Sequence, residues 1–174
     1  MGYRALYIWV EGDKDFRFFD SIMKPIFENK YDYVKIIKYG ETKKEKINSY
    51  LESIILMGSD YIFVGDINTY SDEKHKKQEL KHKYKKVDEN RIIVVKREIE
   101  SWYLAGLDLK SSKILQIPYL NNTDEIVKEQ FNSMMPRKFD SEIDFMIEIL
   151  KHYSIDIAKQ KNESFRNFID EYDC

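Results

Sequence analysis

The sequence predicts an α/β protein with a central, mostly parallel four-stranded sheet, helices on both faces and a helical carboxyl-terminal extension. Over about the first hundred residues, short apolar segments rich in β-branched and aromatic residues alternate with segments whose apolar residues recur every three or four positions. The connections between these segments are short, as is typical of parallel sheets that are covered by helices. A chain of 174 residues, 43% of them hydrophobic, is long enough to bury a sizeable core.

Strands are predicted at about 4–10, 33–38, 61–65 and 91–96. The first helix starts near Asp13, which can cap it, and is disturbed at Pro25 because proline lacks an N–H donor. A second helix covers about 42–57 and opens on the capping-box pattern Thr42-Lys43-Lys44-Glu45. A polar helix over about 71–86 precedes the last strand.

From about residue 100 the alternation gives way to helices. A short helix is predicted at 100–107, where Trp102 and Tyr103 are expected to be core residues rather than a stacking platform for a base. Residues 108–122 contain Pro118 and a short apolar piece, Ile114-Leu115, and no element is assigned to them. Further helices are predicted at 123–134, 141–153 and 155–172. We therefore expect an α/β core at 1–107 and a helical extension at 108–174, within a single domain overall.

Composition narrows the classes of protein. No apolar run approaches the roughly 18–20 residues that cross a bilayer, and the first residues lack a signal-peptide layout. The single cysteine, Cys174, excludes an intramolecular disulfide and a cysteine-based zinc site. We therefore expect a cytoplasmic protein without a membrane partner. None of the six glycines is followed by lysine, so there is no Walker A loop, and nucleotide hydrolysis would need a separate ATPase.

Polar side chains follow three of the predicted strands at the point where each strand ends. Glu11 follows the first strand, Asp66 and Asn68 follow the third, and Glu98 and Glu100 follow the last. Because the carboxyl ends of parallel strands form one edge of a sheet, these groups are expected to converge there. A cluster of carboxylates is unfavourable without a cation, and Mg²⁺ or Mn²⁺ held by oxygen ligands suits it. If a helix begins earlier in the last segment, at most one of its two glutamates reaches the edge.

Three short motifs resemble the TOPRIM domain: Glu11-Gly12-x-x-Asp15 before a pair of phenylalanines, Asp66-x-Asn68, and Arg97-Glu98-Ile99-Glu100-Ser101-Trp102. The resemblance covers about 4–107. The third motif is similar to stand-alone TOPRIM-like proteins allied to the OLD (overcoming lysogenization defect) nucleases. The resemblance implies a Rossmann-like fold and a metal-dependent reaction on nucleic acid.

The resemblance also implies roles for individual residues. Glu11 would be a metal ligand or general acid/base, Asp15 the aspartate of the same motif, and Asp66 the principal metal ligand. Asn68 stands where the family has a second aspartate, so it would bring an oxygen ligand but no charge. The metal would then bind more weakly unless Glu98 or Glu100 supplies the missing negative charge. Gly12 is expected to allow another backbone or a phosphate to come close.

Basic residues suggest how a polyanion would be held. The segment 74–86 contains seven lysines, and a run of this kind is also typical of a solvated helix face. We predict phosphate contacts that do not depend on base sequence for six residues: Lys81, Lys83, Lys85, Lys86, Lys96 and Arg97.

The leading functional hypothesis is a Mg²⁺- or Mn²⁺-dependent phosphodiesterase that acts on DNA or RNA, with Glu11, Asp15, Glu98 and Glu100 as catalytic residues. A second hypothesis is a non-catalytic TOPRIM-like module that binds nucleic acid or works with a separately encoded ATPase, and Asn68 favours it. A third is a receiver-like signalling domain with a phosphoacceptor pocket. It ranks last because acidic residues follow the last strand, where a receiver domain needs a lysine.

Overall fold

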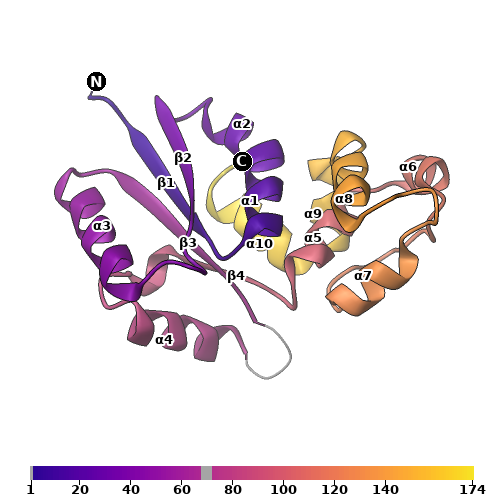
Figure 1. Cartoon of the computed structure of the whole chain (residues 1–174). Coiled ribbons are helices and arrows are strands. Elements are labelled where there is room, and N and C mark those ends of the chain that lie inside the picture. The colour runs from indigo at the N-terminus through magenta and orange to yellow at the C-terminus, as the bar shows by residue number, and fades with distance from the viewer. Residues whose placement is uncertain (1, 68–71) are drawn as a thin grey trace. The chain divides into compact units, whose positions relative to one another are not determined.

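The structure is a computed structural model that describes residues 2–67 and 72–174, and the chain divides into two compact units, residues 1–94 and 95–174. The first unit is α/β and the second is helical (Figure 1). The predicted fold class, a parallel four-stranded sheet flanked by helices and followed by a helical region, is confirmed.

The sheet contains β1 (Ala5–Val10), β2 (Tyr33–Lys38), β3 (Asp60–Asp66) and β4 (Ile92–Val95) in the order β2-β1-β3-β4. Strand β1 pairs in parallel with β2, with Ala5 opposite Tyr33, and with β3, with Leu6 opposite Asp60. The chain therefore steps outward from β1 to β2 and then returns past β1 to β3. This reversal makes the carboxyl ends of β1 and β3 a topological switch point, where open parallel sheets bind ligands.

The first helical segment runs without a break from residue 13 to residue 27. It consists of α1 (Asp13–Phe18), a π-helical turn η1 (Phe19–Met23) and α2 (Lys24–Phe27). The N–H of Lys24 donates to the carbonyl of Phe19, five residues back, and Pro25 follows at the start of α2. The predicted disturbance at Pro25 therefore takes the form of a π turn just before the proline, which has no N–H to donate.

Two predicted helix caps are wrong. Helix α3 (Lys44–Leu56) begins after Lys43, whose backbone is extended, and no side chain caps it. The hydroxyl of Thr42 instead lies 3.5 Å from the carbonyl of Lys38, so the Thr42–Glu45 capping box does not form. Asp13 is the first residue of α1 and not its cap, because Gly12 holds the cap position.

The remaining helices of the first unit are α4 (Glu73–Lys83) and the short 3₁₀ helix η2 (Glu89–Arg91). Figure 1 shows α3 and α4 on one face of the sheet and α1 and α2 on the other. The face under α3 and α4 is aromatic, and Trp9 stacks on Phe63 with 6.2 Å between ring centroids. Its other buried members include Tyr39, Ile47, Leu51, Ile54, Tyr61, Leu80 and Tyr84.

The second unit contains α5 (Ile99–Ala105), α6 (Leu109–Leu115), α7 (Lys128–Met134), α8 (Glu142–Lys151), α9 (Ile155–Lys161) and α10 (Glu163–Glu171). The prediction that Trp102 and Tyr103 are core residues is confirmed, since both side chains are fully buried. Trp102 stacks on Phe168 of α10 at 5.5 Å between centroids, so no face of the indole is available to a base.

Two predictions for the helical region are wrong. The expected helix at 155–172 is broken at Asn162, which ends α9, adopts an extended backbone and caps α10 by accepting from the N–H of Phe165. The unassigned segment 108–122 contains α6, which Asp108 caps by accepting from the N–H of Ser111. The helix predicted from 123 begins only at Lys128.

Candidate functional site

The candidate site lies at the carboxyl edge of the sheet in the first unit. Glu11 directly follows β1, and Asp66 is the last residue of β3, so the two carboxylates come from the two strands that flank the switch point. The side chain of Glu11 is exposed, whereas Asp66 is half-buried and its Oδ1 atom is shielded from solvent. The strand order places Glu11 and Asp66 at the carboxyl ends of neighbouring strands, and their joint role in one site stays a prediction.

The backbone of Glu11 is held by β2. The N–H of Tyr39 donates to the carbonyl of Val10 and the N–H of Gly40 to that of Glu11, each over 2.9 Å, so β1–β2 pairing continues beyond both strands. A Cβ atom at Gly40 would lie 2.4 Å from the carbonyl oxygen of Glu11, which is far inside van der Waals contact. Glycine at position 40 is therefore what lets the two chains come close enough to fix Glu11.

The close approach that we expected at Gly12 is not found among the described residues. Its backbone is extended, and a Cβ atom there would meet only Oδ2 of Asp15, at an ordinary 3.8 Å. The N–H of Gly12 instead donates to Oδ2 of Asp15 over 3.2 Å. The buried carboxylate of Asp15 thus holds the turn that follows Glu11, and its assignment as a catalytic residue stays a prediction.

Tyr39 connects the outer strand to β3 and was not identified from the sequence. Its hydroxyl donates to the carbonyl of Val64 over 2.6 Å, and its ring stacks on Phe63 at 4.4 Å between centroids. Because the strand order is β2-β1-β3, this side chain reaches past the end of β1. A large aromatic residue at the end of an outer strand, directly before Gly40, was the available sequence signal.

The pKa of the Tyr39 phenol is affected by burial and by nearby carboxylates. Burial, the larger cause, and the negative charges of Glu11, Asp66 and Asp15 raise the pKa of the Tyr39 phenol well above 10.0. Three carboxylates from two strands and the following turn therefore act on one buried hydroxyl. The phenol therefore stays protonated at neutral pH and donates its hydrogen bond to Val64.

A polar hollow of about 220 Å³ opens beside Glu11, and Gly12, Asp13, Lys38, Glu41 and Thr42 complete its lining. Lys38 donates to Asp13 over 2.5 Å, and this hydrogen bond lowers the pKa of the Asp13 carboxyl. The hollow is smaller than the roughly 300–1,000 Å³ of typical small-molecule pockets. Its size suits one group of an extended polymer better than an enclosed metabolite.

Lys76 of α4 is a second residue that the sequence analysis missed. Only 8% of its surface is exposed, and its Cε lies 3.3 Å from the position that a Cβ atom would take on Gly65, next to Asp66. Its Nζ lies 3.6 Å from Oε1 of Glu79. Lys76, Leu80 and Tyr84 are all buried and lie four residues apart, so they share one face of the helix. This spacing was the sequence signal that distinguishes Lys76 from the exposed lysines around it.

The predicted phosphate-binding lysines of this region, Lys81, Lys83, Lys85 and Lys86, are all exposed. Lys85 and Lys86 lie beyond the end of α4, and Lys86 pairs with Glu52 of α3 over 2.9 Å. The exposure agrees equally with a solvated face and with a surface for phosphates.

The second unit places the remaining predicted site residues. Helix α5 begins before Glu100, so Glu98 and Glu100 do not share an extended stretch of chain. Glu98 is the N-cap of α5, and its Oε2 accepts a hydrogen bond of 2.5 Å from the N–H of Lys128 at the start of α7. Glu100 is buried within α5. Their convergence with Glu11 and Asp66 stays a prediction.

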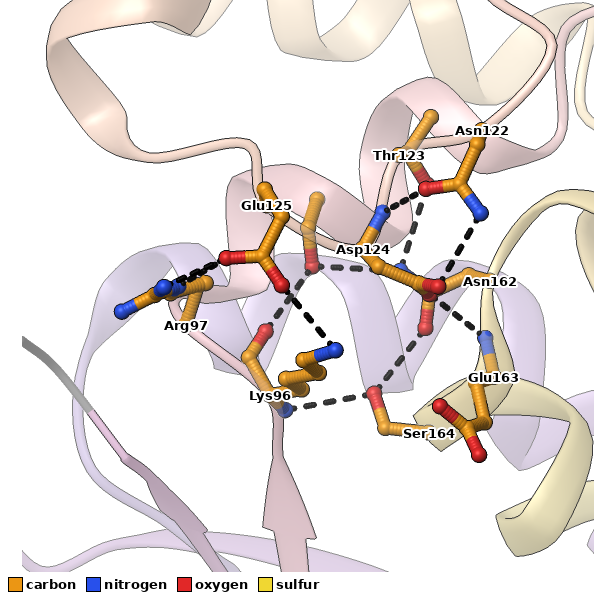
Figure 2. Close-up of polar contacts among 10 residues, drawn as sticks. Lys96, Arg97, Asn122, Thr123, Asp124, Glu125, Asn162, Glu163 and Ser164 are labelled. Carbon is orange, nitrogen blue, oxygen red and sulfur yellow. Dashed lines mark hydrogen bonds and ion pairs between the residues drawn. The ribbon is translucent and has the colours of Figure 1, made fainter. Parts of the chain in front are cut away.

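Lys96 and Arg97 face a carboxylate of their own unit. Lys96 Nζ lies 3.0 Å from Oε1 of Glu125, and Arg97 Nε donates to Oε2 over 2.7 Å (Figure 2). Glu125 could not be singled out from the sequence, because it follows Lys96 by 29 residues in a segment without a motif.

The expected metal can be compared with the donors at the sheet edge. Carboxylate oxygens suit a divalent cation in chemistry, and Glu11 and Asp66 are the residues that would hold it. Among residues 2–67 and 72–174, no group of three His, Cys, Asp or Glu side chains is arranged to hold an ion. Asn68, the third predicted ligand, lies outside the described residues.

No protein-family model, no curated protein and no solved structure matches this chain. The TOPRIM resemblance therefore rests on the short motifs alone. In the described part of the chain, no helix combines the length and the apolar character that a membrane span requires.

Proposed function

We propose that the chain is a divalent-metal-dependent phosphodiesterase that acts on DNA or RNA. The observation that carries the proposal is the position of Glu11 and Asp66 at the carboxyl ends of β1 and β3, the two strands that flank the switch point. A site for substrate at that edge is the general expectation for this sheet topology. The small polar hollow beside Glu11 favours a polymer substrate that extends beyond it.

In this proposal, two carboxylates bind the metal and three other residues position them. Glu11 and Asp66 would hold the cation, which when bound activates water and stabilises charge on the scissile phosphate. Asp15 and Gly40 fix the backbone on either side of Glu11. Tyr39 ties the end of β2 to β3 two residues before Asp66, so it is a positioning residue for both carboxylates.

Cleavage assays with the purified chain test this proposal. End-labelled single-stranded and duplex DNA and RNA are incubated with Mg²⁺, with Mn²⁺ or with EDTA. We expect cleavage of at least one substrate in the presence of metal, and its loss in Glu11→Gln and Asp66→Asn variants that unfold at the same temperature as the parent. Absence of cleavage for all four substrates with either metal would refute a phosphodiesterase.

A second function is favoured by Asn68 and by the engagement of Glu98 with α7. Asn68 removes one negative charge in comparison with the TOPRIM pattern, and one oxygen of Glu98 already accepts the N–H of Lys128. In this alternative the chain binds nucleic acid, or assists a separate ATPase, without cleaving. Binding without cleavage in the parent, together with metal-dependent cleavage by Asn68→Asp, would favour it.

A further inference from the structure

The turn between β4 and α5 contains a strained residue. Arg97 has a φ of 66°, in the left-handed region that L-residues other than glycine avoid. The other described non-glycine residues with positive φ, Gln116 and Asp173, lie at the ends of α6 and α10, where this conformation is common. No helix ends at Arg97, so tertiary contacts must hold its conformation.

Buried polar groups hold this turn in place. The N–H of Lys96 donates to Oγ of Ser164 over 3.2 Å, and its carbonyl accepts from Oγ of Ser101 over 3.4 Å. Ser164 also accepts from Nε1 of Trp102 and donates to Oδ1 of Asn162, each over 2.9 Å. The backbone next to Arg97 is thereby tied to the junction of α9 and α10 (Figure 2).

The same junction holds the opposite chain segment, residues 122–125. Asn162, which has no exposed surface, donates through Nδ2 to Oγ1 of buried Thr123 over 3.2 Å. The N–H of Thr123 donates to the carbonyl of Lys161 over 2.9 Å, and the N–H of Glu163 donates to Oδ1 of Asp124 over 2.7 Å. A network of hydrogen bonds centred on the buried Asn162 side chain makes both segments rigid.

The side chain of Glu125, at the end of the segment 122–125, contacts the cationic side chains of Lys96 and Arg97 on the other segment. Arg97 contacts Oε2 through Nε and Nη2, and Lys96 contacts Oε1. The carboxylate is the most exposed member, with 59% of the side chain accessible against 34% for Arg97 and 38% for Lys96. The cations are therefore fixed at their backbone, whereas the Glu125 side chain can rotate into solvent.

We propose that Lys96 and Arg97 form a binding site for a backbone phosphate of nucleic acid, and that Glu125 occupies this site as an internal competitor in the ligand-free chain. The choice of nucleic acid as ligand rests on the proposed function. Exposed ion pairs contribute little to stability, so stability does not explain a strained arginine next to a residue whose backbone is tied to Ser101 and Ser164. Oxygens of a carboxylate and of a phosphate are recognised by the same guanidinium and ammonium donors, so one can replace the other.

Binding assays in EDTA test this site separately from cleavage. The affinity of the full chain for a short fluorescent single-stranded oligonucleotide is measured by anisotropy for the parent, Glu125→Gln and Glu148→Gln. Glu148 is the matched control, because its half-buried carboxylate pairs with Lys151 in the same unit and loses the same charge. Glu125→Gln should bind about 2- to 30-fold tighter than the control, because the ligand no longer breaks two exposed ion pairs. Equal affinities of the two variants would overturn the proposal.

Arg97→Gly provides the second arm, since glycine adopts the left-handed backbone without strain and only the guanidinium is lost. In the Glu125→Gln background, Arg97→Gly should abolish the gain in affinity. The plot of log K against log salt concentration should also become less steep by about 0.7. An undiminished gain would overturn the site. Glu125→Ala repeats the test without any amide and must show the same gain.

The outcomes separate the site from the proposed function. A gain in affinity in EDTA without cleavage in Mg²⁺ or Mn²⁺ refutes the phosphodiesterase and supports the phosphate site. Metal-dependent cleavage with no gain in Glu125→Gln supports the phosphodiesterase and overturns the internal competitor. No measurable binding by any variant overturns the site.

Discussion

Replacing Gly40 by alanine should destabilise the first unit and displace Glu11. The added Cβ would lie 2.4 Å from the carbonyl oxygen of Glu11, so the two backbones must separate and lengthen the 2.9 Å hydrogen bond between them. Overpacking of this kind costs about 1–3 kcal/mol, and a lost hydrogen bond costs about 1 kcal/mol. Alanine returns about 0.4–1 kcal/mol by restricting the unfolded chain. We therefore expect a net loss of about 2 kcal/mol in the free energy of unfolding.

The assay can be confined to the unit that contains the change. The chain has two tryptophans, Trp9 in the first unit and Trp102 in the second, and both are buried. In a Trp102→Phe background, urea unfolding followed by tryptophan fluorescence reports on Trp9 alone. Gly2→Ala in the same background is the control, because a Cβ at Gly2 meets no atom within 4 Å. Its effect should stay within about 0.5 kcal/mol.

Equal stabilities of the Gly40→Ala and Gly2→Ala variants would refute the close approach of Gly40 to Glu11. The melting temperature should fall by about 4–8 °C for a loss of about 2 kcal/mol in a chain of this length. If Glu11 holds a cation, the Gly40→Ala variant should also bind Mn²⁺ more weakly. This second effect tests the proposed role of Glu11, whereas the loss of stability tests the geometry alone.

Three further predictions concern the sheet edge and its surroundings. Tyr39→Phe should cost about 1 kcal/mol at neutral pH through its lost hydrogen bond to Val64. Because the pKa of Tyr39 is raised in the folded chain, the folded chain binds this proton more tightly than the unfolded chain, and the parent should lose stability as the pH rises above 10. In urea unfolding, Tyr39→Phe should lose less stability over the same pH range. An unchanged alkaline loss would contradict this. Asp66→Ala should abolish Mn²⁺ binding in calorimetry while the metal-free fold stays as stable or becomes more stable, through relief of like-charge repulsion; unchanged affinity would remove Asp66 from the site. Joint replacement of four exposed lysines by glutamine, Lys81, Lys83, Lys85 and Lys86, should weaken oligonucleotide binding. The plot of log K against log salt concentration should become less steep by about 0.7 for each lost contact to a single strand, and an identical steepness would mark a solvated face.

Local signals predicted some features well and others poorly. Three of the four strands, β1, β3 and β4, were predictable because they are nearly continuous apolar runs, as buried parallel strands are. The outer strand β2 was predictable from alternation instead, with Val34 and Ile36 buried on either side of the exposed Lys35. Helix ends were less predictable, since several residues near an end can cap it. Thr42 and Glu45 match the capping-box pattern, yet α3 begins two residues later and Thr42 contacts the carbonyl of Lys38 instead.

The break at Asn162 shows how tertiary contacts override a helical pattern. Apolar residues continue at helical spacing on both sides of this position, so the sequence predicted one helix. In the fold, Asn162 accepts from the N–H of Phe165 and donates to Ser101 and Thr123 from distant parts of the second unit. These partners exist only after the helices have packed, so no local pattern contains them.

By itself, the sequence determined the α/β class and the positions of Glu11 and Asp66 at the ends of strands, because both depend on apolar periodicity within a few residues. Only the tertiary structure decided that β1 and β3 are neighbours, that Tyr39 reaches past β1 to Val64, and that Gly40 must lack a side chain. It alone revealed the Glu125 carboxylate between Lys96 and Arg97. These features depend on contacts between residues 25 or more positions apart, or on the order of strands across the sheet, and packing of the whole unit determines both.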